Sequence, residues 1–397
     1  MVGIFFWACI FLVIYIYIGY PFLITLIASF RKDSMNESIY LPTLTLLIAA
    51  YNEEKIITEK LENSLSLDYP RNHLQIIVAD DGSTDETANI VRSFYNRGVQ
   101  LISYPQRRGK LSAINNAMQK VHSEIVLFSD ADNFYQLDAV REIVKPFSNS
   151  TVGAVSGGRV VLGESALGEA EGSYWKYEEF IKRQESRMGS CVGVAGDALA
   201  IRTDLYTYPP PNVINDDFYI ALSILRQGYR VVYAPKARSF HPISSSAKGE
   251  IERRTRIVAG RYQSLYFAKD VLPYKNPFLI WQIISHKYLR VLIPFFMVGA
   301  LLANLFVLFV PANTKFPAWI QLSHPYNWVV LYLQLLFYLT SWLGMRFRFN
   351  GLIGKILYIP TFLVNSNFAA IRGLFRFLMD RQPSTWHRVS HSGRSID

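Results

Sequence analysis

Two aspartates, Asp130 and Asp132, directly follow an apolar run of strand length at residues 125–129. A buried parallel strand over this run would bring both carboxylates to its carboxyl end, which is the edge where open α/β sheets bind ligands. Two hard oxygen donors at such an edge suit Mg²⁺ or Mn²⁺ that carries a substrate diphosphate. A strand that ends in an Asx turn would show the same residues, so the pair alone leaves both interpretations open.

Two more polar segments follow predicted strands. Tyr-Asn-Glu at 51–53 comes after a strand at 44–50, and Asp-Asp-Gly-Ser at 80–83 comes after a strand at 74–79. A tyrosine at a strand end can stack on a base, and a carboxylate can accept the imide N–H of a uracil ring. Helix capping explains either segment alone. Because both segments lead to the same sheet edge as Asp130, the combination favours a nucleotide site.

Asp216 and Asp217 form a second carboxylate pair. They precede an amphipathic pattern at 218–226 that is typical of a helix. Capping of this helix by Asp216 is the simplest interpretation, and the spacing alone assigns the pair no chemistry.

The elements that must position these side chains lie between residues 41 and 271. Strands are expected at 44–50, 74–79, 99–104 and 125–129, and helices at 53–67, 84–95 and 111–121. Strands that alternate with helices of about 10 to 15 residues predict right-handed crossovers and a mostly parallel, Rossmann-like sheet with helices on both faces. The fold class is therefore α/β for this region, with α-helical transmembrane segments on either side.

The N-terminal segment is apolar enough to cross a bilayer. Residues 3–30 contain no charged side chain and exceed the roughly 20 apolar residues that a span requires. A signal peptide would be shorter and would begin with a basic region. Arg31 and Lys32 follow directly, so the positive-inside rule places residues 41–271 in the cytoplasm.

The C-terminal third is also apolar. Residues 272–290 suit a helix at the membrane interface, and 291–310 and 326–345 are of spanning length. Residues 356–371 are expected to be re-entrant or interfacial, because a further crossing would place the basic tail at 379–397 outside. We expect a multi-pass protein of the inner membrane.

Charge and cysteine content exclude other classes. The net charge of +10 does not require a nucleic-acid partner, because basic residues flank the apolar segments and suit a membrane protein: Lys287, Arg290, Arg346, Arg348, Arg372 and Arg376. The two cysteines, Cys9 and Cys191, cannot build a disulfide framework or a thiolate zinc site.

Residues 44–260 resemble the family 2 glycosyltransferases, and within them the membrane-bound cellulose-synthase-like branch. The resemblance rests on six motifs in order: Tyr-Asn-Glu at 51–53, Asp-Asp-Gly-Ser at 80–83, Arg-Gly-Lys at 108–110, Asp-Ala-Asp at 130–132, Asn-Asp-Asp at 215–217 and Arg-Arg-Thr-Arg at 253–256. It implies a nucleotide-binding fold of the GT-A type, transfer with inversion, and in most members a UDP-sugar donor.

The resemblance also implies roles for individual residues. Tyr51, Glu53 and Asp81 would hold the uridine, with Asp80 close by. Asp130 and Asp132 would hold the metal, Mg²⁺ or Mn²⁺, and the diphosphate, with Lys110 near the donor and Arg256 on the diphosphate. Asp217 would be the general base that takes a proton from the acceptor hydroxyl. Asp197, Asp216 and Arg253 are expected on the acceptor side.

The chain departs from the family at three positions. Processive polysaccharide synthases read Gln-x-x-Arg-Trp where this chain has Arg253 and Ile257 at the Gln and Trp positions, and this puts processive synthesis in doubt. Asp197 stands where a small residue is usual. It is expected either to bind an acceptor hydroxyl or to form a salt bridge with Arg202 or another base.

Two charged segments have a simpler interpretation. The pattern at 174–187 is rich in both acidic and basic residues, which is typical of a solvated helix face with i,i+4 pairs. Arg254 lies in a segment that would also suit a basic belt against anionic lipid headgroups.

The expected function is transfer of a sugar from a UDP-sugar to a hydroxyl of a membrane-held acceptor, either a lipid-linked saccharide or a growing glycan. A processive synthase that also translocates its polymer is the alternative within the enzyme class, and it would need spans from an oligomer or a partner subunit. A nucleotide-sugar-binding scaffold without activity is the alternative of another class. Such a scaffold would have no use for Asp217.

Overall fold

The computed structural model of the chain describes residues 1–31, 40–162, 166–242, 247–309, 317–347 and 351–379. Lys32, Arg348 and residues 380–397 of the predicted basic tail lie outside these ranges.

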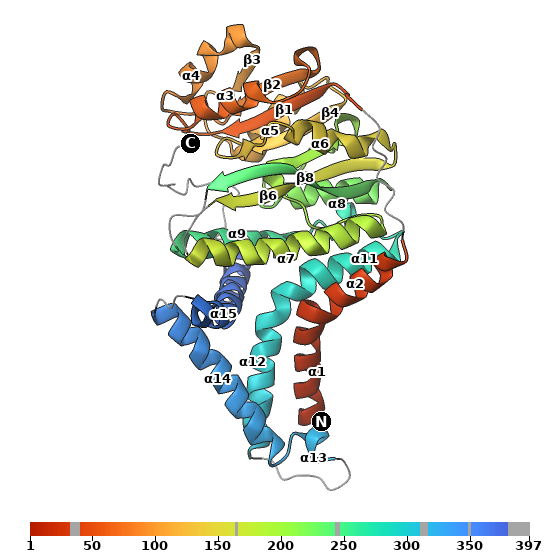
Figure 1. The fold of residues 1–397 in the computed structure, drawn as a ribbon, viewed down its shortest axis with the longest axis vertical. Helices are drawn as coiled ribbons and strands as arrows, with labels where there is room; N and C mark the ends of the chain where they lie inside the picture. The colour runs from red at the N-terminus through yellow and green to blue at the C-terminus, as the bar shows by residue number, and fades with distance from the viewer. Residues whose placement is uncertain (32–39, 163–165, 243–246, 310–316, 348–350, 380–397) are drawn as a thin grey trace.

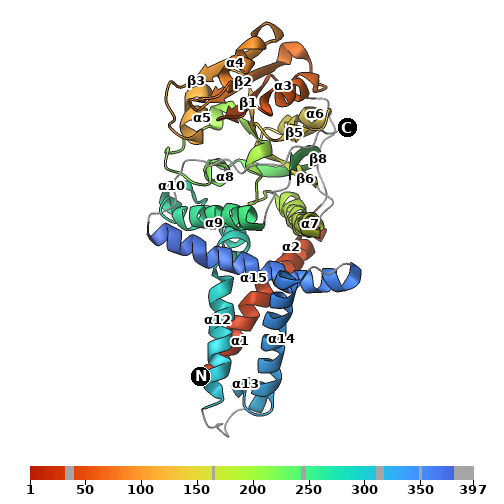
Figure 2. The ribbon, with the colours of Figure 1, turned by 90° about the vertical axis from the view of Figure 1, so that its left-hand side faces the viewer.

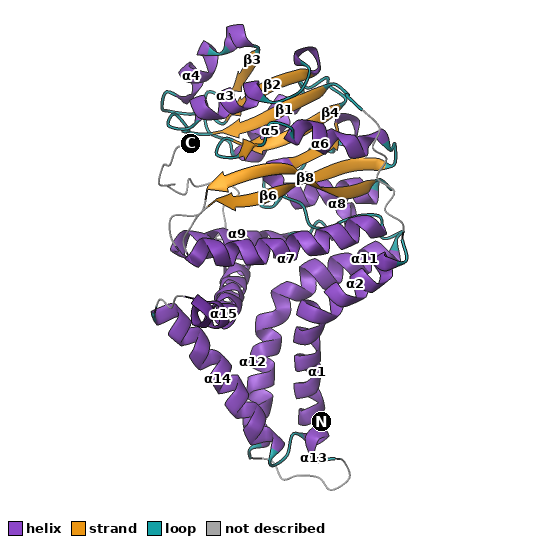
Figure 3. Cartoon of the chain, in the orientation of Figure 1, coloured by secondary structure: helices purple, strands orange, loops and turns teal. Residues whose placement is uncertain are grey.

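A mixed sheet of eight strands forms the centre of residues 41–271, which are called the catalytic region below because the resemblance predicts catalysis there (Figures 1 and 3). Their order across the sheet is β3-β2-β1-β4-β7-β6-β8-β5. The strands are β1 (Leu44–Ala50), β2 (Leu74–Asp80), β3 (Val99–Ser103), β4 (Ile125–Asp130), β5 (Phe134–Tyr135), β6 (Val152–Leu162), β7 (Leu199–Arg202) and β8 (Arg230–Pro242).

The first four strands are parallel to one another, as the alternation of strands and helices predicts. β1 is buried along its whole length, which suits a central strand covered on both faces. The four predicted strands agree with the structure to within one residue at each end. The other half of the sheet is less regular, because β7 runs antiparallel to both β4 and β6, and β6 pairs with β8 through two register shifts.

Helices of the catalytic region cover both faces of this sheet (Figure 3). One core packs α3, α4 and α6 against one face, and a second core packs α5 and α8 against the other. The helices are α3 (Ile57–Ser66), α4 (Thr87–Ser93), α5 (Lys110–Met118), α6 (Ala139–Val144), α7 (Ala166–Met188), α8 (Asp216–Arg226), α9 (Ala247–Gln263) and α10 (Ala268–Val271).

The remaining helices form an elongated bundle below the sheet (Figures 1 and 2). They are α1 (Val2–Ile14), α2 (Tyr20–Ser29), α11 (Pro277–Ile283), α12 (Leu289–Val307), α13 (Ala318–Gln321), α14 (Tyr326–Arg346) and α15 (Gly351–Leu378). Within the described ranges, three continuous helices are long and apolar enough to cross a membrane: Val2–Ser29, Pro277–Val307 and Tyr326–Arg346.

The predicted interfacial helix at 272–290 and the predicted span at 291–310 are one continuous helix of 31 residues. A π-helical turn at Ile284–Tyr288 joins α11 to α12, and the axis bends there (Figure 1). Leu279 and Ile283 of α11 belong to the second core of the catalytic region. The catalytic region and this helix therefore share one hydrophobic core.

α15 lies across the bundle, directly beneath α9, rather than along it (Figure 2). It contains the weaker apolar segment at 356–371 and is not among the three candidate spans. Gly373 allows close approach, since a Cβ there would lie 2.9 Å from both Val258 and the carbonyl oxygen of Thr255 on α9.

The expectation of a solvated charged face on α7 is met on one side of the helix, where Lys176 and Arg183 are exposed, but it is wrong for the other side. Glu178, Lys182 and Glu185 are each at most 5% exposed, because α7 and α9 form a layer between the sheet and the bundle (Figures 1 and 2). Charges that look like i,i+4 surface pairs are in fact enclosed by helices from distant parts of the sequence.

Candidate functional site

The carboxyl ends of β1, β2 and β4 meet at one edge of the sheet. In the parallel ladders Ala50 pairs with Asp80, and Ala49 pairs with Asp130. The residues that directly follow these strands are therefore neighbours, and Tyr51, Asp81 and Asp132 come from adjacent loops. The three motifs lie at one edge, as their spacing predicts.

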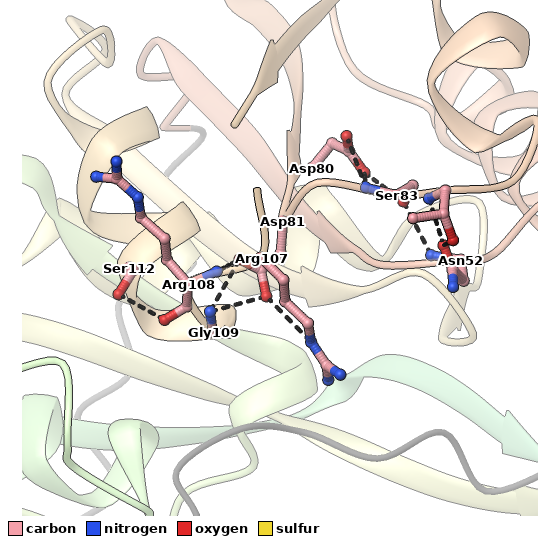
Figure 4. A network of polar contacts seen from close by, with 9 residues as sticks. Asn52, Asp80, Asp81, Ser83, Arg107, Arg108, Gly109 and Ser112 are labelled. Atoms are coloured by element: carbon pink, nitrogen blue, oxygen red, sulfur yellow. Dashed lines mark hydrogen bonds and ion pairs between the residues drawn. The ribbon is translucent and has the colours of Figure 1, made fainter. Parts of the chain in front are cut away.

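Asp81 organises the loop at residues 107–109 (Figure 4). Its Oδ1 accepts hydrogen bonds from the backbone N–H of Arg108 at 2.8 Å and of Gly109 at 2.9 Å, and its Oδ2 accepts from Gly109 at 2.9 Å. Burial raises the pKa of the Asp81 carboxyl, although these N–H groups oppose the shift. Asp81 thus fixes the start of α5, and its contact with uridine remains a prediction.

Arg107 is a residue that the motifs did not single out. Its guanidinium lies 3.9 Å from the centre of the Tyr51 ring, and its Nε lies 3.8 Å from Oδ2 of Asp81. An arginine that already stacks on a tyrosine face offers a planar cationic surface beside the predicted base site. The only sequence signal was the basic run at 107–110, of which the motif includes just the last three residues.

Asp80 accepts hydrogen bonds from residues at the ends of β2 and β3. It accepts hydrogen bonds from the backbone N–H of Ser83 at 3.2 Å and from the hydroxyl of Ser103 at 2.6 Å. Asn52 accepts from the N–H of Thr84 at 2.8 Å, which joins the loops after β1 and β2 (Figure 4). Glu53 is buried in the same region.

Lys110 connects the two carboxylate pairs. Its Nζ forms an ion pair with Asp130 and lies 4.0 Å from Oδ2 of Asp216. Burial disfavours the charge on Lys110, but the carboxylates of Asp130 and Asp216 outweigh burial and hold its pKa above the ordinary value. The first turn of α5 and the first turn of α8 are thereby held on either side of the end of β4.

Lys60 lies behind the Asp130–Asp132 segment and was missed from the sequence. It is fully buried on α3, and its Nζ donates to the hydroxyl of Ser129 at 2.8 Å and to the carbonyl of Asn133. Burial lowers the pKa of Lys60 to about 7, although Asp132 and Asp130 act in the opposite direction. A lysine on the apolar face of a predicted helix was the available signal.

The aspartates fit a divalent metal bound jointly with a diphosphate. Among the residues that the structure describes, no three His, Cys, Asp or Glu side chains lie close enough to hold a metal by themselves. Two carboxylates at an edge lined by cations suit Mg²⁺ or Mn²⁺, which takes further ligands from substrate phosphates. Asp130 and Asp132 would hold it.

Asp217 lies in the first turn of α8, across from the strand ends. Its Oδ1 accepts a hydrogen bond from the backbone N–H of Phe218 at 2.7 Å, and Gly196 packs against it so closely that a Cβ would lie 3.0 Å from the Asp217 Cβ. Burial and the neighbouring carboxylate of Asp216 raise the pKa of Asp217 to about 6, while Arg256 is near enough to oppose the shift. A carboxylate in this range can exchange a proton near neutral pH.

Asp217 also lines a cavity of about 220 Å³ between the catalytic region and the bundle. Arg253, predicted on the acceptor side, lines the same cavity, and its guanidinium lies 5.9 Å from the ring centre of Trp175. The structure thus brings Asp217 and Arg253 to one enclosed space, and Asp216 lies beside it at the start of α8.

Asp197 is 5% exposed and makes an ion pair. Its Oδ2 lies 3.6 Å from Nε of Arg159, which lines the cavity. The expected pairing with Arg202 is wrong, because Arg202 instead lies 3.1 Å from Glu124 at the other end of β7. The base that pairs with Asp197 comes from β6.

Arg254 is half-buried and packs against other parts of the protein, and its contact with lipid headgroups remains a prediction. Its guanidinium lies 4.9 Å from the Tyr174 ring and 4.7 Å from the Phe362 ring, and it donates to the hydroxyl of Ser366 at 3.3 Å. Arg254 is enclosed between α7, α9 and α15.

The chain was compared with known families and proteins. The model of glycosyl transferase family 2 matches residues 45–207. Over 229 residues the chain is 28% identical to a poly-beta-1,6-N-acetyl-D-glucosamine synthase of Staphylococcus epidermidis and 27% identical to that of Staphylococcus aureus strain COL. Each match covers 56% of this chain and 55% of the relative, so the chain matches about half the length of these curated relatives.

A solved structure resembles nearly the whole chain. The mannosyltransferase PcManGT from Pyrobaculum calidifontis, in complex with GDP-Man and Mn²⁺, superposes with a TM-score of 0.70 at 21% identity, covering 96% of this chain and all of that one. This likeness confirms the predicted GT-A-type fold.

Proposed function

We propose that this protein is a glycosyltransferase of family 2, whose model matches residues 45–207, and that it transfers a sugar from a UDP-sugar to a hydroxyl of a membrane-held acceptor. The main support for this proposal is that Asp130 and Asp217, near the same edge of the sheet, have different neighbours. Asp130 pairs with a lysine, whereas burial and Asp216 raise the pKa of Asp217 to about 6. Metal binding needs the first environment, and proton transfer needs the second.

The reaction is a single displacement. The acceptor oxygen forms a bond to the anomeric carbon as the bond from that carbon to the diphosphate oxygen breaks, and UDP leaves. Asp217 takes the proton that the acceptor hydroxyl loses. Attack from the side opposite the leaving group inverts the configuration at the anomeric carbon.

Basic residues at the edge would assist departure of UDP. Lys110 lies between Asp130 and Asp216, and Arg256 lies within electrostatic range of Lys110 and of Asp217. Arg suits a diphosphate because its planar fork can contact two oxygens at once. Mg²⁺ or Mn²⁺ at Asp130 and Asp132 would supply charge stabilisation for the leaving diphosphate.

The membrane location supports the choice of acceptor. In the described part of the chain, three helices are long and apolar enough to span a bilayer, and two of them, Val2–Ser29 and Pro277–Val307, contribute residues to the wall of the cavity that contains Asp217. A catalytic region that shares a core with such a helix stays at the bilayer surface, where a membrane-held acceptor would be presented. We propose that this surface is the cytoplasmic face of the inner membrane.

Processive polymer synthesis is the second candidate, because the relatives are named as poly-beta-1,6-N-acetyl-D-glucosamine synthases. Ile257, at the position of the tryptophan in processive synthases, is the observation against it. Gel filtration of the radiolabelled product separates the two: one added sugar per acceptor supports single transfer, and a ladder of long products supports polymerisation.

The proposal is tested by incubating the purified full chain with a panel of UDP-sugars and GDP-mannose and measuring nucleotide release with and without membrane lipid extract. We expect release from one UDP-sugar that increases when extract is added. EDTA should abolish release, and Mn²⁺ or Mg²⁺ should restore it. Nucleotide release from GDP-mannose alone would contradict the assignment of a UDP-sugar donor. Release that continues unchanged in EDTA would contradict the assignment of a metal.

A further inference from the structure

The cavity that contains Asp217 extends from the catalytic region to the membrane helices. Its walls include Asp217 and Arg261 from α8 and α9, Lys182 from α7, Arg290 from α12 and Phe362 from α15. Of these helices, α7 and α9 form the layer between the sheet and the bundle, and α12 and α15 belong to the bundle (Figures 1 and 2). A molecule held by the membrane could therefore reach Asp217 through this space.

The walls of this cavity carry an excess of positive charge. Seven basic side chains and two carboxylates, Asp217 and Glu178, line it. Arg159 pairs with Asp197, and Lys287 and Arg290 share Glu178. The other basic side chains of the wall are Lys182, Arg253, Arg254 and Arg261. Buried cations are costly unless an anion accompanies them.

Arg290 presents an unused hydrogen-bonding edge. One nitrogen, Nη1, is paired with Glu178, while Nε and Nη2 are buried and have no hydrogen-bond partner within the described part of the chain. These two nitrogens form one side of the guanidinium fork, the side that contacts two oxygens of a phosphate or carboxylate together.

Lys182 is a second cation with unused hydrogen-bonding capacity. It is 2% exposed, and its Nζ lies 4.8 Å from the centre of the Tyr233 ring but has no hydrogen-bond partner among the described residues. Gly193 brings it close to Lys287, since a Cβ at Gly193 would lie 2.9 Å from Nζ of Lys287 and 3.3 Å from Cγ of Lys182. Both lysines therefore pack around Gly193, and with Arg290 they give one wall of the cavity three cations that could face an anion.

We propose that this cavity binds the phosphate groups of the acceptor, so that the acceptor is a saccharide joined to its lipid through a diphosphate. The inference rests on the proposed function and specifies its acceptor. The phosphate oxygens would contact the Arg290 fork and Lys182, and the saccharide would extend to Asp217. A neutral glycan would offer no anionic oxygens to Nε and Nη2 of Arg290 or to Nζ of Lys182.

The test measures binding to the full chain in phosphatidylcholine nanodiscs. The probes are geranylgeranyl diphosphate and geranylgeraniol, its uncharged alcohol, and the readout is tryptophan fluorescence, because Trp175 lines the cavity. We expect the diphosphate to bind at least about 10-fold more tightly than the alcohol. Lys182→Met and Arg290→Lys should each weaken diphosphate binding about 10-fold, and Lys182→Arg should retain it.

The control variant is Lys120→Met, which removes an exposed lysine just after the end of α5. It should bind geranylgeranyl diphosphate as tightly as the wild type does. Thermal unfolding of every variant separates loss of binding from loss of folding, and Lys182→Met is informative even if Arg290→Lys unfolds, since Lys182 has no hydrogen bond to lose.

Equal binding of diphosphate and alcohol, or wild-type affinity in Lys182→Met, would overturn the inference. Nanodiscs of phosphatidylglycerol form the second arm. If that lipid displaces the diphosphate at ordinary membrane content, the cavity is a phospholipid headgroup site and the acceptor assignment fails. Neither result affects UDP-sugar hydrolysis or binding at the sheet edge, so the inference can fail while the proposed function stands.

Discussion

The carboxylates of the site differ in their immediate neighbours, and those neighbours set what each can do. Asp130 pairs with the ammonium of Lys110. Burial and the neighbouring carboxylate of Asp216 together raise the pKa of Asp217 to about 6. The first environment suits binding of cations, and the second suits proton exchange.

This difference predicts the pH dependence of transfer. A base must be unprotonated to act, so kcat/KM should be constant above pH 7 and fall about tenfold per pH unit below about pH 6. Asp216→Asn removes a like charge beside Asp217, which lowers its pKa and should move this acidic limb to lower pH. A limb that stays in place in Asp216→Asn would show that another group titrates.

Lys60 should matter for both stability and activity. Lys60→Met leaves the hydroxyl of Ser129 and the carbonyl of Asn133 without their buried donor, so we expect the free energy of unfolding to fall by about 1–3 kcal/mol. Metal-dependent activity should also fall, since the Asp130–Asp132 segment loses its support. Thermal unfolding and a Mn²⁺ titration of activity measure the two effects.

Lys55→Met is the matched control, because Lys55 is exposed and close to the same helix. If both variants unfold at the wild-type temperature, Lys60 has no structural role.

At the scale of elements, the site depends on loops that are fixed by one another. Gly82 and Gly109 have φ values of 73° and 99°, and the loop at 107–109 donates its N–H groups to Asp81. A Cβ on Gly82 would lie 2.8 Å from the carbonyl carbon of Gln106 and 2.9 Å from the nitrogen of Arg107. The backbones after β2 and before α5 are therefore in direct contact.

Gly82→Ala should weaken UDP binding by moving the loop that carries Arg107 and Lys110. Gly98→Ala is a matched control, since Gly98 has a φ of 89° but open space around its Cβ position. Both substitutions cost about 1–2 kcal/mol of backbone strain. Gly82→Ala adds the clash with residues 106 and 107, so it should lower the unfolding temperature more than Gly98→Ala does. Isothermal titration with UDP should distinguish them, and equal UDP affinities would contradict the proposed contact.

The parallel half of the sheet was predictable because its signals are local. The strands at 44–50 and 125–129 are continuous apolar runs with polar residues at their ends, and their order along the chain fixes which edge the motifs share. β6 and β8 were not predicted. They pair through register shifts at residues 152–158, and β8 includes Pro235, so neither has a regular pattern.

At the scale of the whole molecule, the catalytic region and the membrane helices are one packed body. Ile283 of α11 lies in the core of the catalytic region, and Glu178 of α7 faces His286 at 3.1 Å, Lys287 at 3.9 Å and Arg290. These partners are more than 100 residues apart in the sequence. The periodicity of α7 cannot reveal partners that are so distant in the sequence. For this reason Glu178 looked solvated in the sequence.

Glu178 should be important for stability. Glu178→Ala would leave His286, Lys287 and Arg290 with less compensating charge in a buried site, and we expect a loss of about 3–5 kcal/mol. The unfolding temperature in detergent or nanodiscs measures it. Glu62→Ala, which breaks the exposed pair with Arg97, should leave that temperature unchanged. Similar shifts in both variants would argue against a buried network that joins the two regions.

The most direct test of the central claim compares UDP release by the wild type and by Asp217→Asn, with the donor found in the panel and membrane lipid extract as acceptor. Asn has the shape of Asp but cannot take the proton, so kcat should fall by about 100-fold or more while the affinity for the UDP-sugar is unchanged. Wild-type release by Asp217→Asn would contradict the assignment of Asp217 as the base and the mechanism that depends on it.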